Sequence, residues 1–234
     1  MTLIARDVTA SYRRGQQVVK GIDLTVEPGE FSLILGHNGA GKTTLLNTLY
    51  GTQHLEAGSV TLNGVELAPG TRSRVENGVA FVPSEDAVIP NLTVRENLVV
   101  AATAVPRRAS RDGQAAIKAA LEWFPDLDAK LGSRTRSLSG GQRRMVAIAM
   151  ALAQRPSYLL MDEPSLGLAP SIVDELFEKL AELRSSLGLA TLVVEQTART
   201  TLLSADHIHV IRGGEQAFSG TREEFEKHDL WELL

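Results

Sequence analysis

A glycine-rich loop constrains the fold of this 234-residue chain more than any other feature of its sequence. Residues Gly36–Thr43 match the pattern G-x-x-x-x-G-K-[ST] in full and directly follow the apolar run Phe31–Leu35. Such a short, continuous apolar run is typical of a strand that is buried on both faces. Glycines let the backbone curl so that successive N–H groups point inward, and a following helix adds its positive end. The sequence therefore predicts a buried strand, a phosphate-binding loop and a helix over Lys42–Tyr50.

The side chains of this loop indicate a nucleoside triphosphate as the ligand. Lys42 supplies a mobile positive charge for the β- and γ-phosphates, and the Thr43 hydroxyl can ligate Mg²⁺. His37 occupies a variable position of the pattern, and we expect it to act through its backbone. The residues expected to bind the nucleotide are Gly36, His37, Asn38, Gly39, Ala40, Gly41, Lys42, Thr43 and Thr44. The loop alone does not indicate what the energy of the nucleotide is used for.

A second apolar run ends in two acidic residues. Tyr158–Met161 is followed at once by Asp162 and Glu163. In a parallel sheet the carboxyl end of a strand faces the ligand crevice, which would place this pair beside the phosphate loop. We expect Asp162 to hold Mg²⁺ through water, and Glu163 to polarise the attacking water as a general base. Acidic pairs also begin ordinary loops, and the complete phosphate loop upstream favours the catalytic interpretation.

The string Leu138–Gln142, Leu-Ser-Gly-Gly-Gln, predicts a second anion-binding helix start. A serine hydroxyl and free N–H groups at the positive end of a helix are suited to phosphate. One nucleotide at Lys42 has little need of two such sites on one chain. Two chains facing head to tail would use both, each offering this string to the γ-phosphate held by the other. The residues expected to act in trans are Ser139, Gly140, Gly141 and Gln142. An ordinary helix cap is the alternative for a Ser-Gly pair taken alone.

The remaining pattern is a β-rich opening, a helical middle and a β-α-β ending. Alternation and turn residues predict further strands and helices. The predicted strands are Leu3–Val8, Val18–Val26, Ser59–Leu62 with Val65–Leu67 as a hairpin, Ala190–Val194 and His207–Ile211; the predicted helices are Gln114–Phe124, Gln142–Ala153 and Ile172–Leu187, with a capping box from Thr221 to Glu224 opening a last one. One α/β domain with a parallel-sheet core and a helical arm is the simplest architecture.

Composition excludes several other classes of protein. There are no cysteines, which rules out disulfides, thiol catalysis and cysteine-ligated metals. The net charge of −4 is the wrong sign for a protein that coats nucleic acid, so we expect no nucleic-acid partner. No apolar run approaches the roughly 18–20 residues that cross a bilayer, and the first residues lack a secretory signal. We expect any membrane role to come through a partner. His207 and His209 lie on one strand face without a third ligand, which favours a structural role.

In this order the three strings resemble the nucleotide-binding subunits of ATP-binding-cassette (ABC) proteins, over essentially the whole chain. Gly36–Thr43 corresponds to the Walker A motif of that family, Leu138–Gln142 to its signature and Tyr158–Glu163 to its Walker B motif. The resemblance implies an ATPase that uses ATP and Mg²⁺, with the nucleotide held between two subunits. It also implies that Tyr12 stacks on adenine, with an ordinary strand-end tyrosine as the alternative.

The fold implied by this resemblance is an α/β P-loop NTPase domain. It has a RecA-like parallel-sheet core, an N-terminal antiparallel β lobe and an inserted helical subdomain. We expect a single domain over residues 1–234, with the core and β lobe in 1–84 and 157–234 and the helical subdomain in about 85–156.

Four stretches narrow the resemblance to the ATPase subunits of branched-chain amino acid and amide or urea importers. They are Gly78–Pro83, Asn91–Leu98, Ser165–Pro170 and Val193–Gln196. The implied partners are transmembrane permease subunits, a second ATPase subunit and, indirectly, a solute-binding protein. A heterodimer is favoured over a homodimer, because such importers typically pair two different ATPases. The implied location is the cytoplasmic face of the cell membrane.

Two positions depart from the family pattern. Ser84 stands where most members have a glutamine that ligates Mg²⁺; it could reach the metal through water, or Glu85 could do so after a one-residue shift. Gln196 stands where most members have a histidine that contacts the γ-phosphate. An amide can hydrogen-bond phosphate and water but carries no positive charge. We therefore expect hydrolysis by the isolated chain to be slow and dependent on a partner.

Two other functions stay open at this point. A soluble ABC ATPase of translation, repair or chromosome work usually carries two cassettes, a long coiled coil or zinc-binding cysteines, and this sequence has none of them. A regulatory subunit that hydrolyses weakly is opposed by the intact Lys42, Asp162 and Glu163, but Ser84 and Gln196 keep it open. The sequence does not indicate which substrate is transported.

Overall fold

The computed structural model describes residues 2–13, 15–85, 87–104, 113–196 and 201–228. The strands are β1 (Leu3–Arg13), β2 (Gln16–Val26), β3 (Phe31–Leu35), β4 (Ala57–Leu62), β5 (Val65–Glu66), β6 (Val79–Val82), β7 (Tyr158–Asp162), β8 (Ala190–Glu195), β9 (His207–Arg212) and β10 (Glu215–Thr221). The helices are α1 (Lys42–Tyr50), α2 (Thr71–Glu76), α3 (Val94–Thr103), α4 (Gly113–Glu122), α5 (Gly140–Leu152), α6 (Pro170–Leu187), α7 (Thr201–Ser204) and α8 (Arg222–Phe225), with 3₁₀ turns η1 (Pro125–Lys130) and η2 (Thr135–Ser137).

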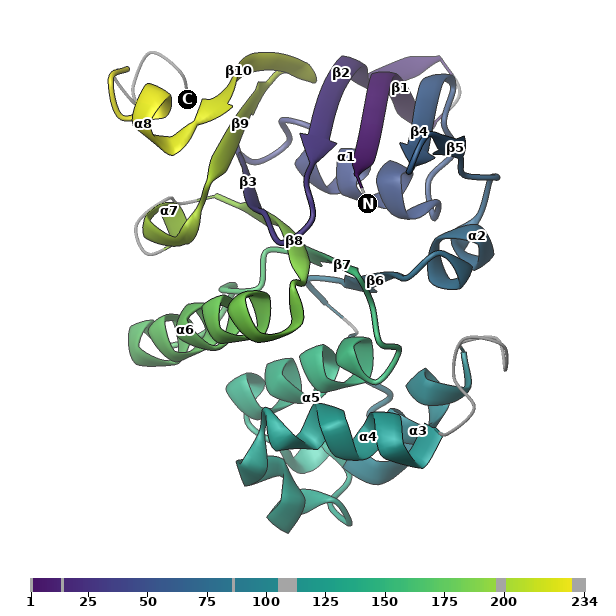
Figure 1. Ribbon diagram of the computed structural model, residues 1–234, viewed down its shortest axis with the longest axis vertical. Coiled ribbons are helices and arrows are strands. Elements are labelled where there is room, and N and C mark those ends of the chain that lie inside the picture. Colours follow the sequence, from purple (N-terminus) through teal and green to yellow (C-terminus); the bar gives the residue numbers. More distant parts are fainter. Residues whose placement is uncertain (1, 14, 86, 105–112, 197–200, 229–234) are drawn as a thin grey trace.

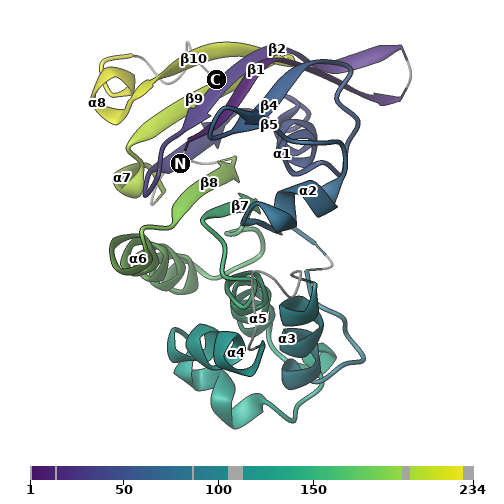
Figure 2. The ribbon, with the colours of Figure 1, turned by 45° about the vertical axis from the view of Figure 1, so that its right-hand side comes forward.

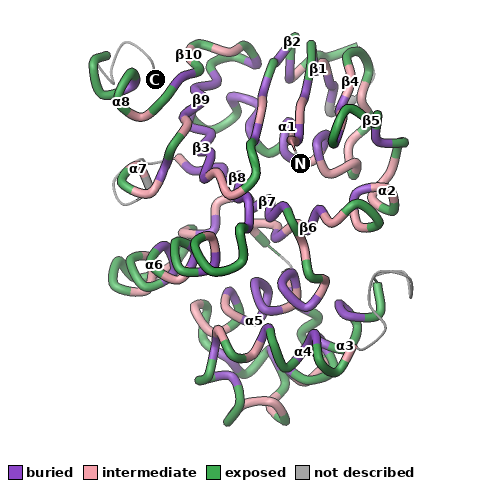
Figure 3. Tube along the Cα trace, in the orientation of Figure 1, coloured by how far each residue is buried: buried purple, intermediate pink, exposed green. Residues whose placement is uncertain are grey.

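A six-stranded sheet forms the centre of the molecule, in the order β10-β9-β3-β8-β7-β6. The five adjacent strands from β6 to β9 run parallel to one another, and β10 pairs antiparallel with β9 at the edge. The strands β3, β7 and β8 are buried along their whole length, in keeping with their mainly apolar sequences (Figure 3).

The two faces of this sheet pack against different layers. On one face Ile34 and Leu160 pack with α1 and with the four-stranded antiparallel sheet β2-β1-β4-β5. On the other face Leu33, Met161 and Val193 pack with helices that include α5 and α6. Because α1 lies between the two sheets, the loop that precedes it is supported from both sides.

The helices α3, α4 and α5 form a separate group at the far end of the molecule from the four-stranded sheet (Figures 1 and 2). In the sequence they lie between β6 and β7, two strands that pair directly. The group is therefore an insertion between adjacent strands of the sheet. A buried amide, Asn97, ties its first helix down by bonding both the N–H and the carbonyl of Ile89.

Most predicted elements are present, and several are corrected in extent. β3 and α1 have the predicted bounds, and the capping box from Thr221 to Glu224 is formed. β1 continues to Arg13 instead of ending at Val8. The strand β10 follows a glycine turn where no strand was predicted, because its half-exposed edge position gives only weak alternation. Leu187 was expected on the buried face of α6 but is 57% exposed.

No helix among the described residues is both long and apolar enough to cross a bilayer.

Candidate functional site

The loop Gly36–Thr43 joins the carboxyl end of β3 to the start of α1. Gly41 precedes the helix with φ of 103°, a conformation that a residue with a Cβ adopts only under strain. A Cβ at Gly41 would also lie 2.7 Å from the carbonyl oxygen of Val18. The glycine is therefore required both by the backbone turn and by the neighbouring strand, and it leaves the N–H groups at the start of α1 free to bind an anion.

Lys42 fills the centre of this loop. Its ammonium donates hydrogen bonds to the carbonyl oxygens of Gly36 at 2.7 Å and His37 at 3.1 Å, and the residue is only 4% exposed. Burial lowers the pKa of Lys42, and the carboxylates of Glu163 and Asp162 oppose that shift. The loop thus curls around a positive charge that faces the acidic end of β7.

The Asp162 carboxylate accepts hydrogen bonds from two hydroxyl groups on one side of the phosphate loop. The Thr43 hydroxyl donates to Asp162 Oδ1 at 3.1 Å, and the Ser84 hydroxyl donates to Asp162 Oδ2 at 3.3 Å. Burial raises the pKa of Asp162, while these two hydrogen bonds act to lower it. Hydroxyl and carboxylate oxygens are the donors that Mg²⁺ accepts, usually few in number and completed by water and phosphate. These residues fit a magnesium ion held beside the phosphate loop.

Glu163 and Gln196 meet across the paired strands β7 and β8. The Gln196 side-chain amide donates to both oxygens of the Glu163 carboxylate, each at 2.8 Å. Glu163 has a φ of 41°, unusual for a residue with a side chain, and its N–H donates to the carbonyl of Val194 at 2.9 Å. This backbone conformation turns the carboxylate away from the line of the strand and toward the amide.

A second buried carboxylate supports the loop that follows Glu163. Glu195 is 3% exposed and accepts bonds from the Ser165 N–H at 3.0 Å and the Ser165 hydroxyl at 2.8 Å. Burial raises the pKa of Glu195, and the bonds from Ser165 oppose the rise. The pair ties the turn after β7 to the end of β8.

The string Leu138–Gln142 opens α5 with a complete capping box. The Ser139 hydroxyl accepts from the Gln142 N–H at 3.2 Å, and the Gln142 side chain accepts from the Ser139 N–H at 3.1 Å. Both ends of this exchange are exposed. A cavity of about 480 Å³ lies beside the string, lined in part by Leu168 and Ile172.

The predicted site residues therefore fall into two groups. The structure brings together Lys42, Thr43, Ser84, Asp162, Glu163 and Gln196. Within the described part of the chain, no hydrogen bond or ion pair joins Ser139 or Gln142 to the phosphate loop. Tyr12 lies in β1, but its side chain is outside the described residues.

Arg144 belongs to the site, although no motif pointed to it. Its guanidinium donates to the carbonyl oxygens of Pro83 and Ser84, each at 2.7 Å. Burial lowers the pKa of Arg144, and the charges of Glu195 and Asp162 oppose the shift. The available signal was a charged residue on an apolar face of a predicted helix, next to Ala147 and Ile148.

His207 and His209 have a structural environment. Their rings stack with centroids 4.8 Å apart, and the Ser219 hydroxyl lies within hydrogen-bond distance of both, at 3.2 and 3.1 Å. No group of three or more His, Cys, Asp or Glu side chains placed to hold a metal ion occurs among the described residues.

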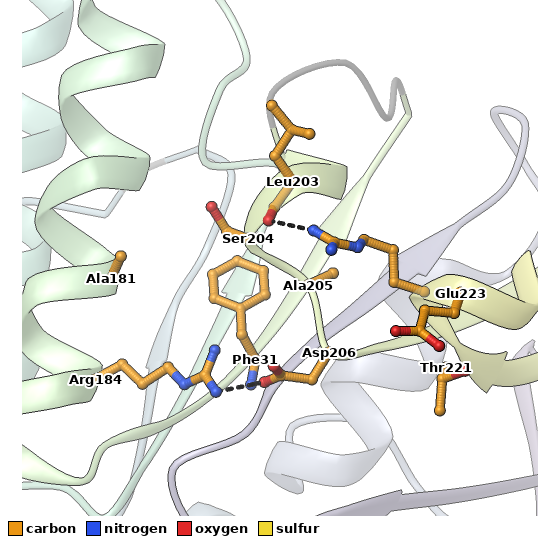
Figure 4. Close-up of a pocket in the computed structure, with 10 residues that line it drawn as sticks. Phe31, Ala181, Arg184, Leu203, Ser204, Ala205, Asp206, Thr221 and Glu223 are labelled. Carbon is orange, nitrogen blue, oxygen red and sulfur yellow. Dashed lines mark hydrogen bonds and ion pairs between the residues drawn. The ribbon is translucent and has the colours of Figure 1, made fainter. Parts of the chain in front are cut away.

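A cavity of about 600 Å³ lies at the opposite end of β3 from the phosphate loop (Figure 4). Three of its charged groups already bond within the protein: Arg184 pairs with Asp206 at 2.8 Å, and Arg222 donates to the carbonyl of Leu203 at 2.8 Å. Its size does not make it the nucleotide site, because none of its lining residues comes from the phosphate loop or from the acidic end of β7.

A buried strand, a glycine loop around a lysine and a second buried strand of the same sheet that ends in acidic residues define a P-loop nucleoside triphosphatase. The family model described as "ABC transporter" matches residues 19–166, and the chain belongs to that family. It is an ATP-binding and ATP-hydrolysing subunit of an ABC transporter.

Curated relatives and solved structures agree with this assignment. The chain is 37% identical over 216 residues to a "Probable branched-chain amino acid transport ATP-binding protein LivF" of Archaeoglobus fulgidus, with 91% of this chain and 89% of that protein covered. It is 36% identical over 213 residues to the "High-affinity branched-chain amino acid transport ATP-binding protein BraG" of Pseudomonas aeruginosa, covering 91% and 90%. The ADP conformation of an ATP-binding cassette of an ABC transporter superposes with a TM-score of 0.86 at 25% identity, covering 97% and 94%.

Proposed function

We propose that this chain powers the import of branched-chain amino acids or related amides. The two relatives named for branched-chain amino acid transport support this cargo, since both match about nine-tenths of each chain. Other relatives carry other names: the "Lipopolysaccharide export system ATP-binding protein LptB" of Escherichia coli is 32% identical over 225 residues. The proposed class of cargo therefore rests on the higher sequence identity to the two relatives named for branched-chain amino acid transport.

The observation that carries the catalytic part of the proposal is the contact between Glu163 and Gln196. We assign Glu163 as the general base, and its carboxylate is held by two bonds of 2.8 Å from one amide. Lys42 binds the β- and γ-phosphates, and the N–H groups of the loop bind the phosphate oxygens. Thr43, Asp162 and Ser84 would hold Mg²⁺, which neutralises charge on the phosphates when bound.

Water attack on the γ-phosphate needs a base that keeps one orientation. The amide of Gln196 donates to both carboxylate oxygens, which fixes the orientation of the Glu163 carboxylate and leaves its other lone pairs to accept from a water. Because an amide stays neutral, it adds no positive charge for the negative charge of the transition state. We therefore propose that the isolated chain turns over slowly and that a partner supplies what is missing.

We propose that two ATPase subunits face each other head to tail, with a second, different ATPase subunit favoured as the partner. The exposed capping box at Ser139 supports the idea, because among the described residues this helix N-terminus makes no hydrogen bond to the phosphate loop of its own chain. In the dimer Ser139, Gly140, Gly141 and Gln142 of one subunit would contact the γ-phosphate held by the other.

We propose that permease subunits dock beside the segment from Ser84 to Leu98, on the cytoplasmic face of the membrane, with a solute-binding protein as an indirect partner. Apolar side chains stay exposed in this region: Ile89 is 42% exposed, and Val100, on the following helix, is 44% exposed. A cavity of about 450 Å³ beside them, lined by Val88 and Pro90, could receive a short membrane-subunit helix.

The test is to tag the chain, extract it from native membranes in mild detergent and identify what co-purifies. Multispanning membrane proteins together with a second ATPase subunit are expected, and the associated binding protein would identify the cargo by its ligand. Recovery of the chain only from the soluble fraction, alone or with ribosomes or DNA, would contradict the transport proposal.

A further inference from the structure

Arg144 connects α5 to the loop that follows β6. Its guanidinium is 7% exposed and donates to two consecutive carbonyl oxygens, those of Pro83 and Ser84, with both distances 2.7 Å. A planar guanidinium holds two donors in a fixed fork, so it fixes the orientation of both peptide units at once. The path of the chain at Ser84 is therefore set by a residue of α5.

The same loop touches the acidic end of β7. The Ser84 hydroxyl donates to Asp162 Oδ2 at 3.3 Å, while Thr43 donates to Asp162 Oδ1 at 3.1 Å. A shift of the Ser84 backbone moves its hydroxyl relative to that carboxylate. Arg144 thus acts on Asp162 through one intervening residue.

We propose that Arg144 is a positioning residue for the metal-side oxygens of the ATP site. By holding the Pro83–Ser84 turn, it keeps Ser84 and Asp162 in the arrangement that Mg²⁺ requires. The inference rests on the proposed roles of Asp162, Thr43 and Ser84 in holding Mg²⁺. Arg144 is an addition to these three residues. Its side chain has no oxygen with which to bind the metal, and it acts through the backbone carbonyls of Pro83 and Ser84.

A second buried arginine that donates to backbone carbonyl oxygens provides a matched control. Arg74 in α2 is 3% exposed, and its guanidinium donates to the carbonyl oxygens of Leu49 at 3.0 Å and Leu67 at 3.2 Å. Those carbonyls belong to the far end of α1 and to the strand-following loop, away from Asp162. Loss of the guanidinium at Arg74 therefore reports what a buried arginine contributes to folding alone.

The experiment compares Arg144→Lys with Arg74→Lys in the full-length chain. A lysine keeps the charge but cannot bond two consecutive carbonyls with a rigid fork. Mn²⁺ binding to the ATP-bound protein is followed by electron paramagnetic resonance, and ATP affinity without metal is measured in EDTA with a fluorescent analogue. For Arg144→Lys we expect the Mn²⁺ concentration at half-saturation to rise about tenfold, the usual effect of losing an outer partner of a metal site. Its metal-free ATP affinity should be unchanged.

Arg74→Lys should lower the unfolding midpoint and leave Mn²⁺ half-saturation as in the wild type. An unchanged Mn²⁺ half-saturation in Arg144→Lys, or an equal rise in both variants, would overturn the inference. If the wild type itself binds no Mn²⁺ with ATP, the proposed magnesium role of Asp162 fails, and the assignment of Arg144 fails with it.

A double-mutant cycle keeps the test independent of the lysine variant's stability. Ser84→Ala removes the hydroxyl but leaves the carbonyls that Arg144 bonds. Because Arg144 is proposed to act through Ser84, the combined variant should raise Mn²⁺ half-saturation no further than the larger single effect. Effects that multiply in the double variant would show that Arg144 acts by another route.

Discussion

At the scale of single residues, the contact between Glu163 and Gln196 fixes the orientation of the carboxylate that we propose as the general base. Both bonds of 2.8 Å come from one amide nitrogen, so the carboxylate is held symmetrically. Glu163 also keeps a φ of 41°, which costs on the order of 1 kcal/mol or more for a residue with a side chain. A strained residue held by a specific partner is typical of a preorganised site.

Replacement of Glu163 by glutamine tests its role as the base. Glu163→Gln keeps the size of the side chain but removes the proton acceptor, so we expect turnover to fall by roughly 10²–10⁴-fold. ATP affinity should stay within about twofold, because Lys42 and the loop N–H groups bind the phosphates. Turnover is measured by phosphate release, with the exposed Glu223→Gln as the control. Fast turnover by the isolated wild-type chain would contradict the expected dependence on a partner.

The buried side chain of His209 makes the free energy of unfolding depend on pH in the acidic range. Burial lowers the pKa of His209 from 6.5 to about 3, so the folded protein keeps the ring neutral where the unfolded chain protonates it. Stability from this group is therefore complete above pH 6.5 and is lost as the pH falls toward 3, by up to about 1.4 kcal/mol per pH unit.

The comparison variant is His209→Phe, which keeps a ring of similar size without a titrating group. Urea unfolding between pH 7 and pH 4 should show a shallower acid loss for His209→Phe than for the wild type. His207→Asn leaves the burial of His209, the larger cause of its lowered pKa, and removes only the smaller charge effect of His207, so it should keep most of the wild-type slope. Parallel loss in the wild type and His209→Phe would mean that the folded protein accepts the proton at His209.

At the scale of elements, α5 carries two contacts at different places, one at its exposed start and one on its buried side. Ser139 caps its exposed start, and Arg144, further along the helix, is buried against the Pro83–Ser84 turn. A single helix therefore links the surface that we propose contacts a second subunit with the proposed metal side of its own nucleotide site.

Two substitutions at Ser139 separate its capping role from its contact in trans. Ser139→Ala removes the acceptor for the Gln142 N–H and should lower the free energy of unfolding by about 1 kcal/mol. Ser139→Asp keeps the cap but places a negative charge toward the partner's γ-phosphate. Its unfolding should resemble the wild type, while ATP-dependent association with the second ATPase subunit should be lost.

Thr221→Ala is the matched control, because Thr221 forms the same capping box at α8. It should also cost about 1 kcal/mol and leave association intact. The association is followed by sedimentation velocity with and without ATP. Undiminished association of Ser139→Asp would exclude this string from the subunit contact.

Elements with a strong local signal could be predicted from the sequence. The continuous apolar runs of β3 and β7 and the glycine start of α1 fix those elements almost to the residue. β6 was not predicted as a strand and β10 was missed, because short or half-exposed edge strands carry little periodicity. Leu187 fits the helical repeat but lies beyond the part of α6 that reaches the core.

Only part of the site could be predicted, because only some of its contacts are local in sequence. The loop around Lys42 is local in sequence, so its pattern is readable. The bond from Gln196 to Glu163 spans 33 residues and depends on β7 and β8 being neighbours. The fork from Arg144 to Pro83 spans 61 residues and depends on how α5 lies against β6. Contacts of this kind follow from tertiary packing and leave no local motif.

At the scale of the whole molecule, the two sheets and the inserted helices give ATP a site built from distant parts of the chain. The phosphate loop and Asp162 come from strands that β8 separates in the sheet. The signature string opens α5, one of the inserted helices. Among the described residues no hydrogen bond joins this string to the phosphate loop of its own chain, in agreement with the proposed head-to-tail pairing of two subunits.

The position of β3 also governs when the protein can first hold a nucleotide during its synthesis. Both strands that flank β3, namely β8 and β9, are drawn from residues 190–212. While the ribosome is still making the helical insertion, β3 has no neighbour of the central sheet to pair with, and pairings this distant in sequence form late. A nascent chain therefore passes most of its translation unable to capture ATP. Nucleotide binding becomes available only once nearly the whole polypeptide has emerged.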